Sequence, residues 1–256
     1  MRPIPRRALL ALPLLTGLPA HAKPVMAATP LSRTDLTWWR ERHQAKLVEL
    51  RQKQPTLIFL GDSITQQWEH SGPPAWQDYA PAWQRLYGDR NAVNLGFIGD
   101  ATAHLLWRIE HGEVGGIFPK VAVVLIGANN LGKLHWSAED TLAGIDAVLA
   151  ALRRRLPATK IVLLSILPSE RNDWATATTL TINKGLAAQY RGGGSVTFLD
   201  VTPVFMKDGR LNRDLFADPK MTPPQVPLHP SAQGQILLSQ AIEPTLAALL
   251  GDRVHK

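Results

Sequence analysis

The sequence predicts an α/β protein built as a three-layer α/β/α sandwich. Five short β-rich segments alternate with helix-like segments along the chain, and the middle β-rich segments are continuously apolar. Strands that are apolar on both faces are covered by helices on both sides, as in parallel sheets. The expected strands lie at 56–60, 92–95, 121–126, 160–167 and 195–200.

Helix-like segments surround and separate these strands. In parallel α/β sheets, ligands bind beyond the carboxyl ends of the strands. The residues that directly follow each strand are therefore the first candidates for a functional site. The expected helices lie at 34–53, 101–111, 138–155, 174–191 and 231–250.

The beginning of the chain has the composition of a secretory signal peptide. Arginines at the start are followed by a short apolar stretch and by Ala20-His21-Ala22, an Ala-x-Ala pattern that precedes cleavage. The apolar stretch is too short, and too interrupted by proline, to span a bilayer. We therefore expect a periplasmic or secreted protein with no transmembrane segment. Its expected parts are a signal peptide at 1–22, a flexible leader at 23–33 and a single domain at 34–256.

The composition excludes several classes of site. The chain has no cysteine, so it can form neither disulfides nor a thiolate zinc site. Its formal charge is +7, and it falls to +4 when Arg2, Arg6 and Arg7 leave with the signal peptide, which holds no acidic residue. The remaining surplus is scattered and forms no basic stripe with interleaved aromatics. This pattern argues against nucleic-acid binding.

Ser63 follows the first expected strand in the sequence Gly61-Asp62-Ser63, at the start of a short helix. Backbone N–H groups point outward there, and the helix dipole favours developing negative charge. The position suits a nucleophilic hydroxyl. It equally suits an ordinary helix N-cap, and we expect Asp62 to organise the turn by hydrogen bonding without reacting.

Three further loops offer groups that acyl transfer requires, namely a base and donors to the tetrahedral oxyanion. Gly96 follows the second strand, Asn129 follows the third, and His229 precedes the last helix. His229 can serve as the base. Gly96 can bring a backbone N–H close to an oxyanion because it has no Cβ, and Asn129 can donate from its side-chain amide. Each residue also has a structural explanation, as a loop glycine, a turn asparagine or a helix-flanking histidine.

The four signals, taken together and in this order, resemble the SGNH (GDSL) hydrolase family. The resemblance covers about Thr56 to Gly234. It is strongest to the branch of the platelet-activating-factor acetylhydrolase catalytic subunits, through Gly61–Thr65, Gly99–Thr102 with Leu106–Arg108, and Ile126–Gly132. The resemblance implies a flavodoxin-like sandwich with five parallel strands and no metal or organic cofactor. It also implies that Ser63 is the nucleophile, that Gly96 and Asn129 complete the oxyanion hole, and that His229 is the general base.

One position departs from the family pattern, which places an aspartate three residues before the histidine. Here that residue is Val226. The aspartate of such a triad holds the imidazole in the right tautomer, and its loss can cost on the order of 10⁴-fold in turnover. Three readings follow. A Ser63–His229 dyad can use the Val226 or Gln225 carbonyl, Asp214 or Asp218 can reach in from upstream, or the protein can be a weakly active relative. We favour the dyad, and the retained site residues favour activity over its loss.

The sequence thus leads to two hypotheses of different classes. The first is an exported serine esterase that removes a short acyl group, most plausibly acetyl, from an O-acylated polysaccharide or a lipid; the same acyl-enzyme could also serve an acyltransferase. The second is a noncatalytic carbohydrate- or lipid-binding module that uses the former active-site cleft. The sequence does not determine the oligomeric state.

Overall fold

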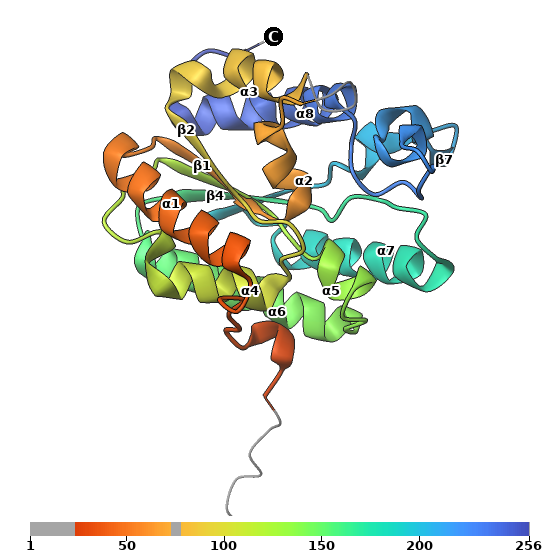
Figure 1. Cartoon of the computed structure of the whole chain (residues 1–256), viewed down its shortest axis with the longest axis horizontal. Helices are drawn as coiled ribbons and strands as arrows, with labels where there is room; N and C mark the ends of the chain where they lie inside the picture. The colour runs from red at the N-terminus through yellow and green to blue at the C-terminus, as the bar shows by residue number, and fades with distance from the viewer. Residues whose placement is uncertain (1–23, 73–77, 256) are drawn as a thin grey trace, which may run out of the picture.

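Five parallel strands form the central sheet of the computed structural model, which describes residues 24–72 and 78–255. The strand order is β2-β1-β3-β4-β5 (Figure 1). Every residue of β1, β2 and β3 is buried, which explains why these segments read as apolar runs. The prediction of a five-stranded parallel sheet is confirmed. The strands are β1 (Leu57–Gly61), β2 (Ala92–Gly96), β3 (Val121–Leu125), β4 (Lys160–Leu164) and β5 (Val196–Leu199).

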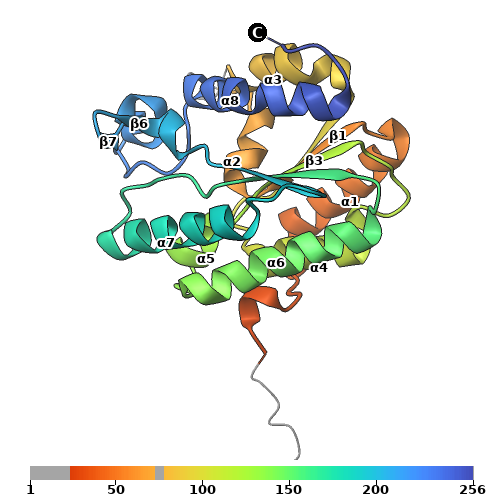
Figure 2. The same cartoon turned by 180° about the vertical axis from the view of Figure 1, so that it is seen from behind.

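Helices cover both faces of this sheet, as the sequence predicts. α3 and α8 lie on one face and α4, α6 and α7 on the other, while α1 lies beside the edge formed by β2 (Figures 1 and 2). A small hairpin of β6 (Met206–Lys207) and β7 (Arg210–Leu211) stands apart from the sheet. The helices are α1 (Thr37–Lys53), α2 (Ser63–Gln66), α3 (Tyr79–Tyr87), α4 (Thr102–Arg108), α5 (Ala128–Gly132), α6 (Ala138–Arg155), α7 (Asp173–Gln189) and α8 (Ala232–Leu250).

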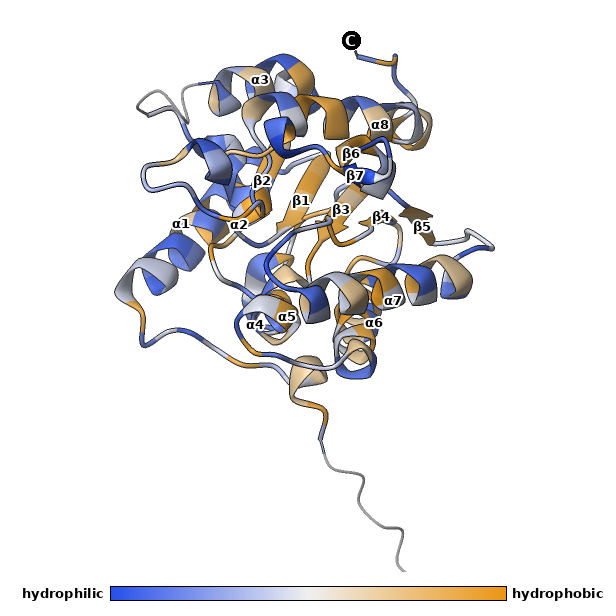
Figure 3. Ribbon diagram, turned by 90° about the vertical axis from the view of Figure 1, so that its right-hand side faces the viewer, coloured by the Kyte–Doolittle hydropathy of each residue, from blue (hydrophilic) through white to orange (hydrophobic). Residues whose placement is uncertain are grey.

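Local sequence signals set the starts of the long helices. The side chains of Ser137, Asn172 and Ser231 cap α6, α7 and α8 by accepting the N–H of the third helical residue. The apolar strands lie between the helical layers (Figure 3). Buried residues of the strands and of the helices form one hydrophobic core. Within the described residues, no helix is long and apolar enough to cross a membrane.

The segment before α1 differs from the expected flexible leader. The signal peptide expected at 1–22 lies outside the described residues, but residues 24–33 pack against α4 and α6. Ala27 is fully buried and its carbonyl accepts a hydrogen bond from Thr102 Oγ1 at 2.8 Å. Leu31 N donates to the Ala103 carbonyl at 3.1 Å. The ordering comes from these non-local contacts, which the composition of the segment does not reveal.

Candidate active site

The turn from β1 into α2 presents Ser63 at the carboxyl edge of the sheet. Asp62 caps α2, since its Oδ1 accepts the Ile64 N–H at 2.9 Å, as the sequence predicts. Ser63 is the first residue of α2, where backbone N–H groups have no partner within the helix. The turn therefore offers both a hydroxyl and an outward N–H at one place.

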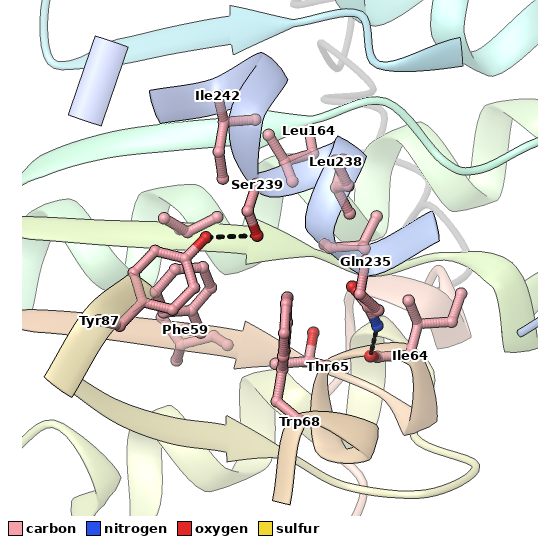
Figure 4. Close-up of a pocket in the computed structure, with 13 residues that line it drawn as sticks. Phe59, Ile64, Thr65, Trp68, Tyr87, Leu164, Gln235, Leu238, Ser239 and Ile242 are labelled. Atoms are coloured by element: carbon pink, nitrogen blue, oxygen red, sulfur yellow. Dashed lines mark hydrogen bonds between the residues drawn. The ribbon is translucent and has the colours of Figure 1, made fainter. Parts of the chain in front are cut away.

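Helix α8 supports this turn from behind. Gln235 Nε2 donates to the Ile64 carbonyl at 2.7 Å, and Tyr87 donates to Ser239 Oγ at 2.7 Å (Figure 4). These side chains line a small internal cavity between α8 and the sheet, and neither Ser63 nor His229 borders it. The Gln235 bond ties α2 to α8, and the reactive groups lie outside the cavity.

Ser63, His229 and Asp218 form a continuous chain of hydrogen bonds. The Ser63 Oγ lies 2.9 Å from His229 Nε2, and His229 Nδ1 lies 2.7 Å from Asp218 Oδ1. With a proton on Nδ1 bonded to the carboxylate, Nε2 is free to accept the serine proton. The arrangement is that of a serine-hydrolase triad.

The dyad reading favoured from the sequence is therefore wrong, because a carboxylate already orients His229. The second reading correctly included Asp218, whereas Asp214 is exposed and makes no bond to the imidazole. Val226, at the family's aspartate position, is 51% exposed. Neither it nor Gln225 supplies a carbonyl to the ring.

The chain reaches this arrangement through a loop whose ends meet. The Asp218 carbonyl accepts the Gln225 N–H at 3.0 Å, so residues 219–224 leave and return to the same place. Asp218 Oδ2 accepts the N–H groups of Leu228 at 2.8 Å and His229 at 2.6 Å. The Ala217 N–H donates to the His229 carbonyl at 2.8 Å. Asp218 is thus adjacent to His229 in space although 11 positions separate them in sequence.

These bonds also keep Asp218 ionised. Burial by itself raises the pKa of this carboxyl group, but the hydrogen bonds from the His229 ring and from the His229 and Leu228 N–H groups outweigh burial and lower its pKa below the ordinary value. A charged Asp218 stabilises the imidazolium that forms when His229 takes a proton.

Asp62 has the opposite environment. It is fully buried, and this burial raises its pKa to about 6, against the lowering effects of the Ile64 N–H, His229 and Arg171. Its Oδ2 lies 3.4 Å from Asn129 Nδ2. The carboxyl group therefore joins the Ser63 turn to Asn129, and it changes charge in the mildly acidic range.

Asn129 lies where the sequence predicts, at the start of α5 and beside the Ser63 turn. Its Nδ2 donates to the Asp100 carbonyl at 2.9 Å, and the long contact to Asp62 involves the second hydrogen only weakly. One amide hydrogen is thus fixed, which orients the side chain. The other amide hydrogen of Asn129 is available for donation to a stronger acceptor, such as an oxyanion.

Gly96 does not fit the oxyanion role expected from the sequence. Its N–H donates to Asn94 Oδ1 at 2.8 Å and is not available. A Cβ at this position would lie 2.2 Å from the Gln66 nitrogen and 2.8 Å from the Asp62 carbonyl oxygen. Gly96 is needed for close packing of β2 against α2.

Gly99, three residues later, carries the available N–H. In this loop the Phe97 N–H donates to Gly61, the Ile98 N–H to Gln66 and the Asp100 N–H to Phe97. Among the residues that the structure describes, the Gly99 N–H has no acceptor. The backbone turns there with a φ of 78°, which favours glycine. The sequence contains both glycines of Asn-x-Gly-x-x-Gly, and only the fold distinguishes their roles.

A cleft opens over Ser63 and His229. Its volume is about 220 Å³, smaller than the roughly 300–1,000 Å³ of pockets that bury drug-sized ligands. Such a cleft suits a small acyl group. The walls of the cleft are formed by α2 and the residues after it, by the loop that contains Gly99, and by the loop from Asp218 to His229. The lining residues are Ser63, Gln67, His70, Ile98, Asp218, Met221, Gln225 and His229.

A buried ionic network fixes Asp100, the residue that follows Gly99. Arg108 Nε donates to Asp100 Oδ2 at 2.9 Å, its Nη1 pairs with Glu113, and all three side chains are fully buried. Trp39 Nε1 donates to Asp100 Oδ1 at 2.8 Å. The network fixes Asp100, whose carbonyl in turn orients Asn129.

Across residues 24–72 and 78–255, no three His, Asp or Glu side chains are grouped to hold a metal ion.

Comparisons with known proteins identify the family of the chain. The chain is 31% identical to platelet-activating factor acetylhydrolase IB subunit alpha2 of Rattus norvegicus over 196 residues, which cover 74% of this chain and 80% of that protein. A GDSL-like lipase from Bacteroides thetaiotaomicron VPI-5482 superposes with a TM-score of 0.63 at 16% identity, covering 81% of this chain and 97% of the other.

A carbohydrate acetylesterase family member from Sinorhizobium meliloti has the same fold, with a TM-score of 0.57 at 17% identity, and the match covers 77% of this chain and 99% of that chain. The profile of the GDSL-like Lipase/Acylhydrolase family matches residues 59–237, from β1 into α8. The resemblance read from the sequence is confirmed: the chain belongs to the GDSL-like lipase/acylhydrolase family.

Proposed function

We propose that this protein is an exported carboxylic-ester hydrolase that removes short acyl groups, chiefly acetyl, through an acyl-enzyme on Ser63. The observation that carries the proposal is the bonded chain Ser63–His229–Asp218 at the floor of a small cleft. The presence of the orienting carboxylate supports catalysis over a noncatalytic binding module.

In the proposed reaction, the Ser63 Oγ attacks the ester carbonyl while His229 Nε2 takes its proton. The bond to the alcohol breaks as His229 returns that proton to the leaving oxygen. Water then attacks the acyl-enzyme, with His229 as base, and releases the acid. Asp218 stays ionised throughout and holds the ring.

The oxyanion would be stabilised by three donors, namely the N–H groups of Ser63 and Gly99 and the Asn129 amide. The Ser63 N–H lies at the start of α2, the Gly99 N–H has no acceptor in the described part of the chain, and Asn129 is bonded to the residue after Gly99. Removal of one such donor typically reduces turnover about 100- to 1000-fold.

The small cleft and the relationship to an acetylhydrolase support an acetyl ester as substrate. The signal-peptide pattern at 1–22 supports export, and an exported enzyme meets O-acetylated polysaccharides and envelope lipids. The Sinorhizobium protein, named a carbohydrate acetylesterase, shares only the fold at its identity and so adds no substrate argument.

The test uses p-nitrophenyl acetate and a fluorophosphonate probe on the mature protein. Wild type is expected to hydrolyse the ester and to be labelled, whereas Ser63→Ala loses both activities. Ser195→Ala is the matched control, because that serine is exposed at the amino end of β5. Hydrolysis and labelling that persist in Ser63→Ala, or that are absent from wild type, would overturn the proposal.

A further inference from the structure

Two cationic side chains converge on Gly99. A Cβ placed on Gly99 would lie 2.6 Å from Lys133 Nζ and 3.3 and 3.4 Å from the two terminal nitrogens of Arg33. The ammonium and the guanidinium therefore approach a single point. Because glycine has no side chain, that point is open to them.

Both cations have donors to spare. Arg33 Nη1 donates to the Ile98 carbonyl at 2.8 Å and to Asp100 Oδ1 at 2.9 Å, but no acceptor is found for its Nη2 within the described residues. Lys133 is exposed, and the same part of the structure provides no hydrogen-bond or ion-pair partner for its Nζ. An ammonium carries three donors and a guanidinium five.

Lys133 is the cation of this cluster that no carboxylate neutralises directly. Arg108 bonds Asp100 and Glu113, and Arg33 also pairs with Asp100, whereas Lys133 has no carboxylate partner among the described residues. Asp62 is a further carboxyl group that interacts with Asp100. Two like charges near one point repel each other, and an anion bound by both relieves that repulsion.

The loop that these two cations contact also borders the cleft. Ile98, whose carbonyl holds Arg33, lines the same cleft as Ser63 and His229. We propose that Arg33 and Lys133 form a subsite for an anionic oxygen group, a phosphate or a carboxylate, on the substrate whose ester Ser63 cleaves. Charged oxygens are the groups that a guanidinium and an ammonium bind best together.

The inference rests on the proposed esterase function and narrows its substrate to negatively charged esters. It is tested with two acetyl esters of one scaffold, 4-acetoxybenzoate, which is anionic, and its neutral methyl ester. The quantity measured is the ratio of kcat/KM for the anionic ester to kcat/KM for the neutral one, at low ionic strength.

Lys133→Ala is expected to lower this ratio about three- to five-fold, the size of an exposed ion pair, and Lys133→Glu is expected to lower it further. Lys133→Arg should restore most of it, and added salt should reduce the wild-type ratio. Lys160→Ala, which removes an exposed charge at the opposite end of the sheet, should leave the ratio as in wild type. An unchanged ratio in Lys133→Ala and Lys133→Glu would overturn the subsite.

Two further measurements separate the possible outcomes. The first is the affinity of inorganic phosphate for wild type and for Lys133→Ala, measured by calorimetry. This measurement needs no hydrolysis, so it tests the subsite even if the esterase proposal fails. Deacetylation of an O-acetylated oligogalacturonate and of an acetylated glycerophosphate tests the source of the anion. A larger loss of deacetylation by Lys133→Ala on one of these two substrates supports the subsite. A larger loss on the oligogalacturonate identifies the ligand as a carboxylate, and a larger loss on the glycerophosphate identifies it as a phosphate.

Discussion

At the scale of the residue, Asp218 is the group that makes the site complete. Its Oδ1 bonds the His229 ring, and its Oδ2 accepts two backbone N–H groups of the segment that carries the ring. One carboxylate therefore fixes both the tautomer of His229 and the position of its backbone. A change at this residue should affect turnover more than substrate binding.

Asp218→Asn is expected to lower kcat on p-nitrophenyl acetate by about 10³- to 10⁴-fold, because an amide does not stabilise imidazolium and can favour the wrong tautomer. KM should change much less. Steady-state kinetics provide the measurement, with circular dichroism to show that the variant is folded.

Two variants serve as controls for this prediction. Asp214→Asn changes the other upstream acid, which is exposed, and should retain wild-type kcat. Val226→Asp places a carboxylate at the family's usual position and should not accelerate turnover, because Asp218 already holds the ring. A strong acceleration by Val226→Asp, or full activity in Asp218→Asn, would contradict the triad.

Asp62 should make stability depend on pH in the opposite sense from Asp218. Its folded-state pKa of about 6 exceeds the ordinary 3.8, so the folded state disfavours the ionised form. The contribution of Asp62 to the free energy of unfolding is therefore fully present below pH 3.8 and is lost as the pH rises to about 6. The loss is on the order of 2–3 kcal/mol, at about 1.4 kcal/mol per pH unit.

The measurement is urea unfolding of wild type and Asp62→Asn between pH 4 and pH 7. The free energy of unfolding of wild type, relative to the variant, should fall from pH 4 to pH 6 and level off above. A difference that stays constant, or that grows with pH, would show that Asp62 is ionised at no cost in the folded protein.

At the scale of the element, the contact between β2 and α2 sets the position of the nucleophile. Gly96 packs against the backbone of α2, and Asn94 from the same strand donates to the Thr65 carbonyl at 2.7 Å. The contact is between main-chain atoms of β2 and of α2, which cannot move aside easily. An added methyl group on Gly96 would therefore clash with the backbone of α2.

Gly96→Ala is expected to lower the free energy of unfolding by about 1–3 kcal/mol, the usual cost of overpacking, and to reduce kcat by displacing Ser63. Urea unfolding and p-nitrophenyl acetate kinetics measure the two effects. Gly192→Ala is the control, since a Cβ there meets nothing within 4 Å. Wild-type stability in Gly96→Ala would contradict the packing role assigned to Gly96.

The elements and the site were predictable from the sequence to different degrees. Strands and long helices depend on local apolar patterns and caps, so all five predicted strands and the five predicted helices are found. The helix α3 was missed although its buried residues recur at helical spacing. Gly96 was preferred to Gly99 because the close packing of Gly96 against α2 is a non-local contact. Asp218 could only be a candidate, since the return of the 219–224 loop is not written in any local pattern.

At the scale of the whole molecule, the segment before α1 lies between the expected cleavage point and the active-site loops. Ala27 of this segment is fully buried, and Arg33 bonds the Gly99 loop. We predict that protein recovered from the periplasm or medium begins at Lys23, as measured by N-terminal sequencing. Recovery of the unprocessed chain from the cytoplasm alone would contradict the proposed export.

The meeting ends of the 219–224 loop also bear on how such enzymes are recognised. Because Asp218 and Gln225 are joined, residues can be inserted or removed between them while acid and imidazole keep their mutual placement. A rule that requires the aspartate three residues before the histidine would therefore miss the bonded triad of this chain. Since Met221 and Gln225 form one wall of the cleft, the length of that insert offers a means of changing substrate choice while the chemistry stays the same.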